Sequence, residues 1–108
     1  MVDTDTFLTF LYVMIDDFDK ARLPPERRPG PPAALTRAAV ITLAMMGQWQ
    51  PFTSERAFYR YALRHWRGAF PTLPDRAQFN RLVRHHQRAL VACFRYLVEV
   101  LNAWRLRV

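Results

Sequence analysis

A helix start bounded by prolines, at residues 70–84, constrains the fold of this chain more than any other stretch. Pro71 and Pro74 exclude helix before them, because proline fixes φ and lacks a backbone N–H. Asp75 then follows as a good N-cap, and Gln78 three residues later completes a capping-box pattern. The sequence therefore predicts a helix that begins at residue 75, and its apolar spacing carries it to residue 105.

This predicted helix has two opposed faces. At about 100° per residue, its apolar residues gather on one side and four arginines gather on the other. The apolar side holds Phe79, Leu82, Val83, His86, Leu90, Cys93, Phe94, Leu97, Leu101 and Trp104, and the other side holds Arg81, Arg84, Arg88 and Arg95. We expect the first face to pack against a core and the second to meet solvent or an anion.

Three more helices are predicted before this one. Apolar spacing and capping residues place them at residues 4–22, 36–46 and 54–66. Thr4 or Asp5 caps the first helix, Thr36 caps the second and Thr53 or Ser54 caps the third, while Gly47 is a natural stop for the second. The helix at 36–46 is apolar on nearly every side, which is typical of a helix at the centre of a bundle.

Five of the eight prolines fall in residues 24–34. Such a stretch forms neither helix nor strand, so we predict a stiff polyproline-type linker that redirects the chain; a proline-rich recognition peptide is the alternative. At 108 residues the chain is long enough for one core. The predicted fold is all-α: a compact bundle of about four helices, forming a single domain over residues 1–108.

The charge is unevenly distributed along the chain. The net charge is +7, yet residues 1–20 hold five aspartates against one lysine, and residues 21–108 hold fifteen arginines against four acidic residues. Arginine suits bidentate contacts with phosphate and guanine. A genome rich in G and C also favours arginine codons, but that does not explain the excess of basic over acidic residues.

A second arginine stripe lies on the predicted helix at 54–66. Its arginines recur every four residues and drift by only about 40° per step, and tyrosines flank them. With the helix before it, this helix resembles a loose helix-turn-helix, although the connector is longer than usual. We hypothesise that the two stripes bind DNA phosphates and that a tyrosine adds a sugar or base contact. The candidate DNA-binding residues are Arg56, Arg60, Arg64, Tyr59, Tyr61, Arg81, Arg84 and Arg88.

The chain shows no pattern of catalytic or metal-binding residues. His85 and His86 point about 100° apart on a helix, so they do not share a metal easily. Asp5, Asp16 and Asp19 share one edge of the first helix, where we favour pairing with arginine over a Mg²⁺ site. We expect no cofactor, no small-molecule ligand and no enzymatic activity. The single cysteine, Cys93, is predicted to be a buried, inert thiol in a reducing cytoplasm.

Several segments of the chain resemble the N-terminal helical region of bacterial insertion-sequence transposases of the DDE type. The most specific is Phe70-Pro71-Thr72-Leu73-Pro74 followed by Phe79-Asn80-Arg81-Leu82. The others are Tyr12-Val13-Met14-Ile15-Asp16-Asp17-Phe18, Leu35-Thr36-Arg37-Ala38-Ala39-Val40-Ile41-Thr42-Leu43 and Phe58-Tyr59-Arg60-Tyr61. Together they cover nearly the whole chain.

The resemblance implies a role in DNA transposition. In that family the helical region precedes a ribonuclease-H-like domain whose carboxylates bind two divalent metals, and the helical region helps to recognise the element's ends or to assemble the dimer. This chain stops near residue 108, so the resemblance implies a truncated transposase or an N-terminal fragment. No catalytic residue carries over, and Mg²⁺ belongs to the domain that is not in this sequence.

An assembly or regulatory module that does not bind DNA is the alternative function. In that case the last helix pairs with a second subunit, as a homodimer or as a mixed dimer with an intact transposase, and the arginines are only solvated. The predicted seam consists of Phe79, His86, Leu90, Cys93, Leu97, Leu101 and Trp104.

Overall fold

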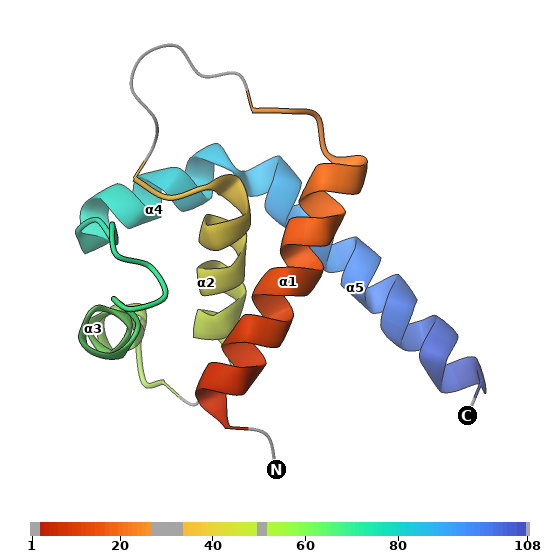
Figure 1. Ribbon diagram of the computed structural model, residues 1–108, viewed down its shortest axis with the longest axis horizontal. Helices are drawn as coiled ribbons and strands as arrows, with labels where there is room; N and C mark the ends of the chain where they lie inside the picture. The colour runs from red at the N-terminus through yellow and green to blue at the C-terminus, as the bar shows by residue number, and fades with distance from the viewer. Residues whose placement is uncertain (1–2, 27–33, 50–51, 108) are drawn as a thin grey trace.

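The structure, a computed structural model, describes residues 3–26, 34–49 and 52–107, and this part of the chain is built from five helices without strands (Figure 1). The helices are α1 (Thr4–Arg22), α2 (Arg37–Trp49), α3 (Glu55–His65), α4 (Arg76–His85) and α5 (Gln87–Arg107). The predicted all-α class is confirmed. Most of the predicted proline-rich linker, residues 27–33, lies outside the described residues.

Local capping sets the helix starts as the sequence predicts. The first helix runs from 4 to 22 as expected, although Asp3 rather than Thr4 or Asp5 caps it, accepting from Thr6 N at 2.7 Å. Three predicted caps are confirmed: Ala39 N donates to Thr36 Oγ1 (3.2 Å), Ala57 N to Ser54 Oγ (3.0 Å) and Gln78 N to Asp75 Oδ1 (2.8 Å). Each cap satisfies an N–H that has no partner within its own helix.

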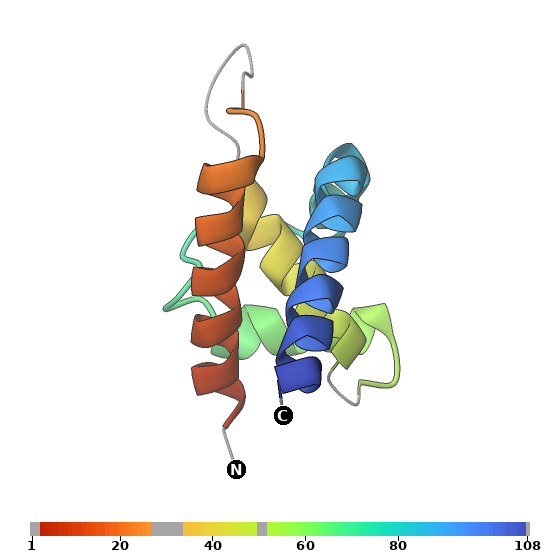
Figure 2. The same ribbon diagram turned by 90° about the vertical axis from the view of Figure 1, so that its right-hand side faces the viewer.

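Helix α2 lies at the centre of the molecule, with α1 along one side and α3 and α4 on the other (Figures 1 and 2). Its residues from Ala38 to Leu43, together with Met45 and Met46, are all buried. The buried Thr42 hydroxyl donates to the Ala38 carbonyl oxygen at 2.8 Å, so its burial leaves no unsatisfied donor. The prediction that this helix forms the centre of a bundle is confirmed.

The predicted end of α2 at Gly47 is wrong, because the helix continues through this glycine to Trp49. Gly47 instead lets α3 approach: a Cβ at this position would lie 3.1 Å from Cδ2 of the Phe58 ring. The absent side chain therefore makes room for the first large apolar residue of α3. A glycine that signals a helix stop in the sequence is here a packing position inside the helix.

The predicted single helix from 75 to 105 is divided at His86, which raises the count from about four to five. His86 has φ −99° and ψ 22°, and α5 sets off from it in a new direction (Figure 1). A straight helix of that length would extend about 45 Å, as long as the 44 Å principal extent of the molecule. The break brings the first half of α5 back against α1, where Phe18 stacks on Tyr96 at 4.7 Å.

The predicted apolar face of this last segment is therefore only partly covered. Phe79, Leu82, His86, Cys93 and Leu97 are buried. Phe94, Leu101 and Trp104 are 51%, 62% and 67% exposed, which contradicts the expectation that the whole face packs on the core. The C-terminal part of α5 projects away from the other helices (Figure 1). None of the described helices is long and apolar enough to cross a membrane.

Candidate nucleic-acid interface

The arginine stripe of α3 lies on the outer side of that helix. Arg56, Arg60 and Arg64 are all exposed. The opposite side of α3 is buried through Phe58 and Ala62. Because one side of the helix is fixed in the core, the three guanidinium groups are held toward solvent as a row.

Tyr59 does not belong to this surface, which corrects its place among the candidate DNA contacts. Its side chain is 3% exposed, its ring packs against Phe79 and its hydroxyl donates to the Pro74 carbonyl oxygen. Desolvation, with the nearby Asp75 carboxylate, raises the pKa of Tyr59 to about 12. Tyr59 therefore joins α3 to the start of α4, and its hydroxyl is not available to DNA.

Tyr61 keeps only part of its surface free. It is half-buried in an aromatic cluster, with ring centroids 5.3 Å from Phe52, 4.2 Å from His65 and 5.4 Å from Trp66. Tyr61 lies beside the exposed arginine row. The exposed edge of its ring is therefore the aromatic surface next to these arginines.

The second stripe follows α4 and continues past the helix break. Arg81 and Arg84 are exposed on the side of α4 away from the buried Phe79 and Leu82. Arg88 is also exposed, but it belongs to the first turn of α5, beyond His86. The break therefore gives Arg88 a direction that a straight helix would not.

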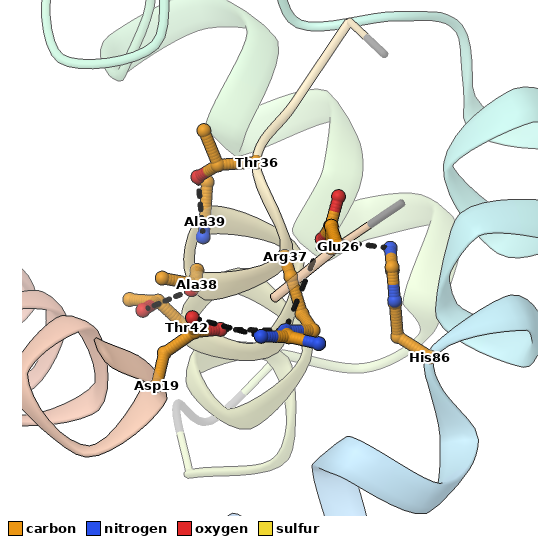
Figure 3. A network of polar contacts seen from close by, with 8 residues as sticks. All are labelled: Asp19, Glu26, Thr36, Arg37, Ala38, Ala39, Thr42 and His86. Carbon is orange, nitrogen blue, oxygen red and sulfur yellow. Dashed lines mark hydrogen bonds and ion pairs between the residues drawn. The ribbon is translucent and has the colours of Figure 1, made fainter. Parts of the chain in front are cut away.

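Three of the four aspartates of α1 have partners other than these arginines. Lys20 Nζ lies 2.9 Å from Asp16 Oδ2, and Trp66 Nε1 donates to Asp5 Oδ1 at 3.1 Å. Asp19 pairs with Arg37 (Figure 3). Within residues 3–26, 34–49 and 52–107, none of Arg56, Arg60, Arg64, Arg81, Arg84 and Arg88 forms an ion pair. All six positive charges are thus available to an external anion.

The Arg37 cluster was not predicted as a unit. Arg37 Nε and Nη2 donate to the two Asp19 oxygens at 2.7 and 3.0 Å, which fixes the end of α1 to the start of α2. This hydrogen bonding raises the pKa of the already basic Arg37. Glu26 Oε1 lies 3.9 Å from Arg37 Nε and 3.8 Å from His86 Nε2, so the cluster extends to the break between α4 and α5 (Figure 3). Sequence spacing gave no signal for it, because its members come from four separate segments.

An apolar cleft of about 570 Å³ opens between α2, α3, α4 and α5. Its wall includes Met45, Phe58, Phe79, Val83, Leu90 and Phe94. Glu55, Arg76 and Arg95 also line it and are exposed. The cleft was not predicted, since it depends on the angle between α4 and α5.

The remaining nucleophile and metal-ligand types are dispersed. Cys93 is 0% exposed, as predicted, and desolvation by burial raises its pKa to about 11. His65 and His85 are exposed, and His86 is buried. Among the described residues, no three His, Cys, Asp or Glu side chains gather in a group that could hold a metal ion.

Comparisons with known proteins add no assignment: no family model, no curated protein sequence and no solved structure matches this chain. The function is therefore inferred from the exposed residues of α3, α4 and α5.

Proposed function

We propose that this chain binds duplex DNA through the outer sides of α3 and α4, as the end-recognition or assembly region of an insertion-sequence transposase. The binding residues are Arg56, Arg60 and Arg64 on α3, Arg81 and Arg84 on α4, and Arg88 at the start of α5. The chain acts on DNA in the cytoplasm without catalysis of its own.

One observation carries this proposal: the six arginines are exposed and have no carboxylate partner among the described residues, while Asp5, Asp16 and Asp19 of α1 are engaged elsewhere. A row of unpaired guanidinium groups on a helix fixed by its core is suited to the phosphates of a DNA strand, because each group replaces condensed counterions. Tyr61 lies beside the row and supplies an aromatic edge for a sugar or base.

Phosphate contacts explain affinity and position but not sequence choice. The α3 stripe therefore orients the chain on the duplex, and selectivity for element ends comes from groups that reach base edges. The assignment to a transposase depends on the sequence resemblance. Reading the nucleotide sequence after codon 108 tests it. A ribonuclease-H-like coding region there supports the assignment, and unrelated sequence argues against it.

DNA binding is tested by fluorescence anisotropy with a labelled duplex at increasing salt. If six phosphates are neutralised, the logarithm of the association constant falls with the logarithm of salt concentration at a slope of about −5. A flat salt dependence, or no binding at about 50 mM salt, would overturn the proposal.

A matched pair of variants separates the arginine surface from total charge. Arg60→Gln removes one positive charge from the middle of the α3 row, and Lys20→Gln removes one from α1, where Lys20 is paired with Asp16. We expect Arg60→Gln to weaken binding and to reduce the salt slope by about 1, with little change for Lys20→Gln. Equal effects would show that net charge alone attracts the DNA.

A further inference from the structure

The solvent-facing side of α5 carries an apolar stripe that is not explained by the DNA-binding surface. Val91, Phe94, Val98 and Leu101 are 42%, 51%, 40% and 62% exposed. At about 100° per residue, these four positions fall within about 80° around the helix. Trp104, which is 67% exposed, lies one turn further on, about 60° outside the stripe and on the side of α5 that carries Cys93 and Leu97. Such a contiguous apolar stripe is unusual on the surface of a monomeric protein and marks an interaction site.

The stripe shares only Leu101 with the seam that the sequence suggests. Of the positions expected to meet a second subunit, Phe79, His86, Cys93 and Leu97 are buried within the chain itself. The exposed positions are offset around α5 from the buried Cys93 and Leu97 by roughly 100°. The surface that remains free is therefore a different side of the helix.

The spacing of the stripe makes it complementary to itself. Its members are separated by three, four and three residues, and this spacing is the same from either end. Two antiparallel copies of α5 therefore align Val91 with Leu101 and Phe94 with Val98. A two-fold interface needs this property, since one patch must fit a second copy of itself.

The charges beside the stripe fit the same arrangement. Arg95 and Glu99 follow one another on one side of it, both exposed. An antiparallel two-fold pair brings this side of one helix against the same side of the other. Arg95 of one copy then lies within about 3 Å, measured along the axis, of the position opposite Glu99 of the other. Two crossed Arg95–Glu99 pairs form, whereas a parallel pair would separate them to opposite edges.

The adjacent cleft extends the contact. Val91 and Phe94 line the cleft as well as the stripe. A contact made by one stripe of a single helix is smaller than a standard protein–protein interface of about 800 Å² per partner, so it belongs with weak, reversible interfaces.

From these observations we infer that the chain forms a homodimer in which two α5 helices pair antiparallel along Val91, Phe94, Val98 and Leu101. The dimer does not require DNA, and the six arginines proposed to bind DNA are not part of its apolar contact. Its interface is small, so we expect a dissociation constant on the order of micromolar.

Sedimentation velocity over a range of concentrations tests the dimer. The intact chain is expected to shift from monomer to dimer, and Leu101→Asp is expected to remain monomeric with an unchanged helical circular-dichroism spectrum. Phe10→Asp on α1 is the matched control, because Phe10 is 65% exposed and lies off the stripe. A chain that stays monomeric up to about millimolar concentration overturns the inference. A dimer that Leu101→Asp does not weaken, or that Phe10→Asp weakens equally, does so too.

The antiparallel register is tested by charge reversal. Arg95→Glu and Glu99→Arg each place like charges together across the axis, and each is expected to weaken the dimer about five-fold. The double variant restores opposite charges and is expected to recover most of the affinity. Failure of the double variant to recover overturns the crossed pairing, even if Leu101→Asp abolishes the dimer.

Discussion

Helix α2 and the second half of α5 have similar apolar character and opposite surroundings. From Ala38 to Leu43 every α2 side chain is buried, while Val98, Val100, Leu101 and Trp104 on α5 are all exposed. The difference is positional: α2 is enclosed by α1, α3 and α4, and the C-terminal part of α5 projects away from the other helices (Figures 1 and 2).

Helical periodicity shows which residues share a side of a helix, but not whether another element covers that side. For α2 the covering is supplied within the chain. For α5 it is supplied, in our proposal, by a second copy. The comparison therefore predicts that equal substitutions in the two helices have very different effects on the stability of the monomer.

The largest expected effect is that of Leu43→Ala in α2. Leu43 is 0% exposed, so its truncation leaves a cavity in the core and lowers the free energy of unfolding by about 2–5 kcal/mol. The same substitution at Leu101, 62% exposed, should change it by less than about 0.5 kcal/mol. Urea unfolding in dilute protein, where α5 is unpaired, measures both. Equal losses would mean that Leu101 is packed within the monomer.

Sequence reasoning located the helices well because their starts are local. Thr36, Ser54 and Asp75 cap α2, α3 and α4 through hydrogen bonds to residues three positions away, and this spacing is visible in the sequence. The central place of α2 followed from its apolar composition on every side. Both properties depend only on neighbouring residues.

The predictions are wrong where residues far apart in the sequence determine the local structure. No glycine or proline marks the break at His86, whose neighbours are Glu26 and, through it, Arg37. Tyr59 falls next to an arginine stripe in the sequence, yet its hydroxyl reaches the carbonyl of Pro74, fifteen residues away. The exposed candidates on α3 and α4 were located correctly as surface residues, while their binding to DNA stays a prediction.

Gly47→Ala is expected to have an intermediate effect on stability. The added Cβ would meet the Phe58 ring at 3.1 Å, so α3 must shift or the ring must turn. This costs about 1–3 kcal/mol, against a gain in helix propensity of about 1 kcal/mol from replacing a glycine within α2. Gly68→Ala is the control, since nothing lies within 4 Å of a Cβ there and the substitution restricts only the unfolded chain. Thermal unfolding followed by circular dichroism should give Gly68→Ala a melting temperature equal to or above that of the unchanged chain. A stable Gly47→Ala variant would show that α2 and α3 are less tightly packed than the buried core indicates.

A further expected effect depends on pH and concerns the buried Cys93 in the first half of α5. Burial raises the pKa of the Cys93 thiol from 9.0 to about 11, so the folded chain favours the neutral form. Its contribution to stability is therefore complete below pH 9 and is lost as the pH rises from about 9 to about 11, by about 3 kcal/mol. Cys93→Ala lacks this titration, so the difference in unfolding free energy between the two chains should shrink over that interval.

Thiol labelling measures the same contrast directly, because the thiolate is the reactive form and must also be accessible. Cys93 in the folded chain should react with an aromatic disulfide reagent far more slowly at pH 8 than a cysteine placed at position 101 in a Cys93→Ser background. The first thiol is enclosed by the core, and the second lies on the exposed stripe. Dimer formation should slow only the labelling of the cysteine at position 101, and more strongly at higher protein concentration. A labelling rate of Leu101→Cys that does not depend on protein concentration would contradict the proposed dimer. The pH dependence thus reports on the burial of Cys93 within the chain. The concentration dependence reports on the burial of position 101 by a second copy.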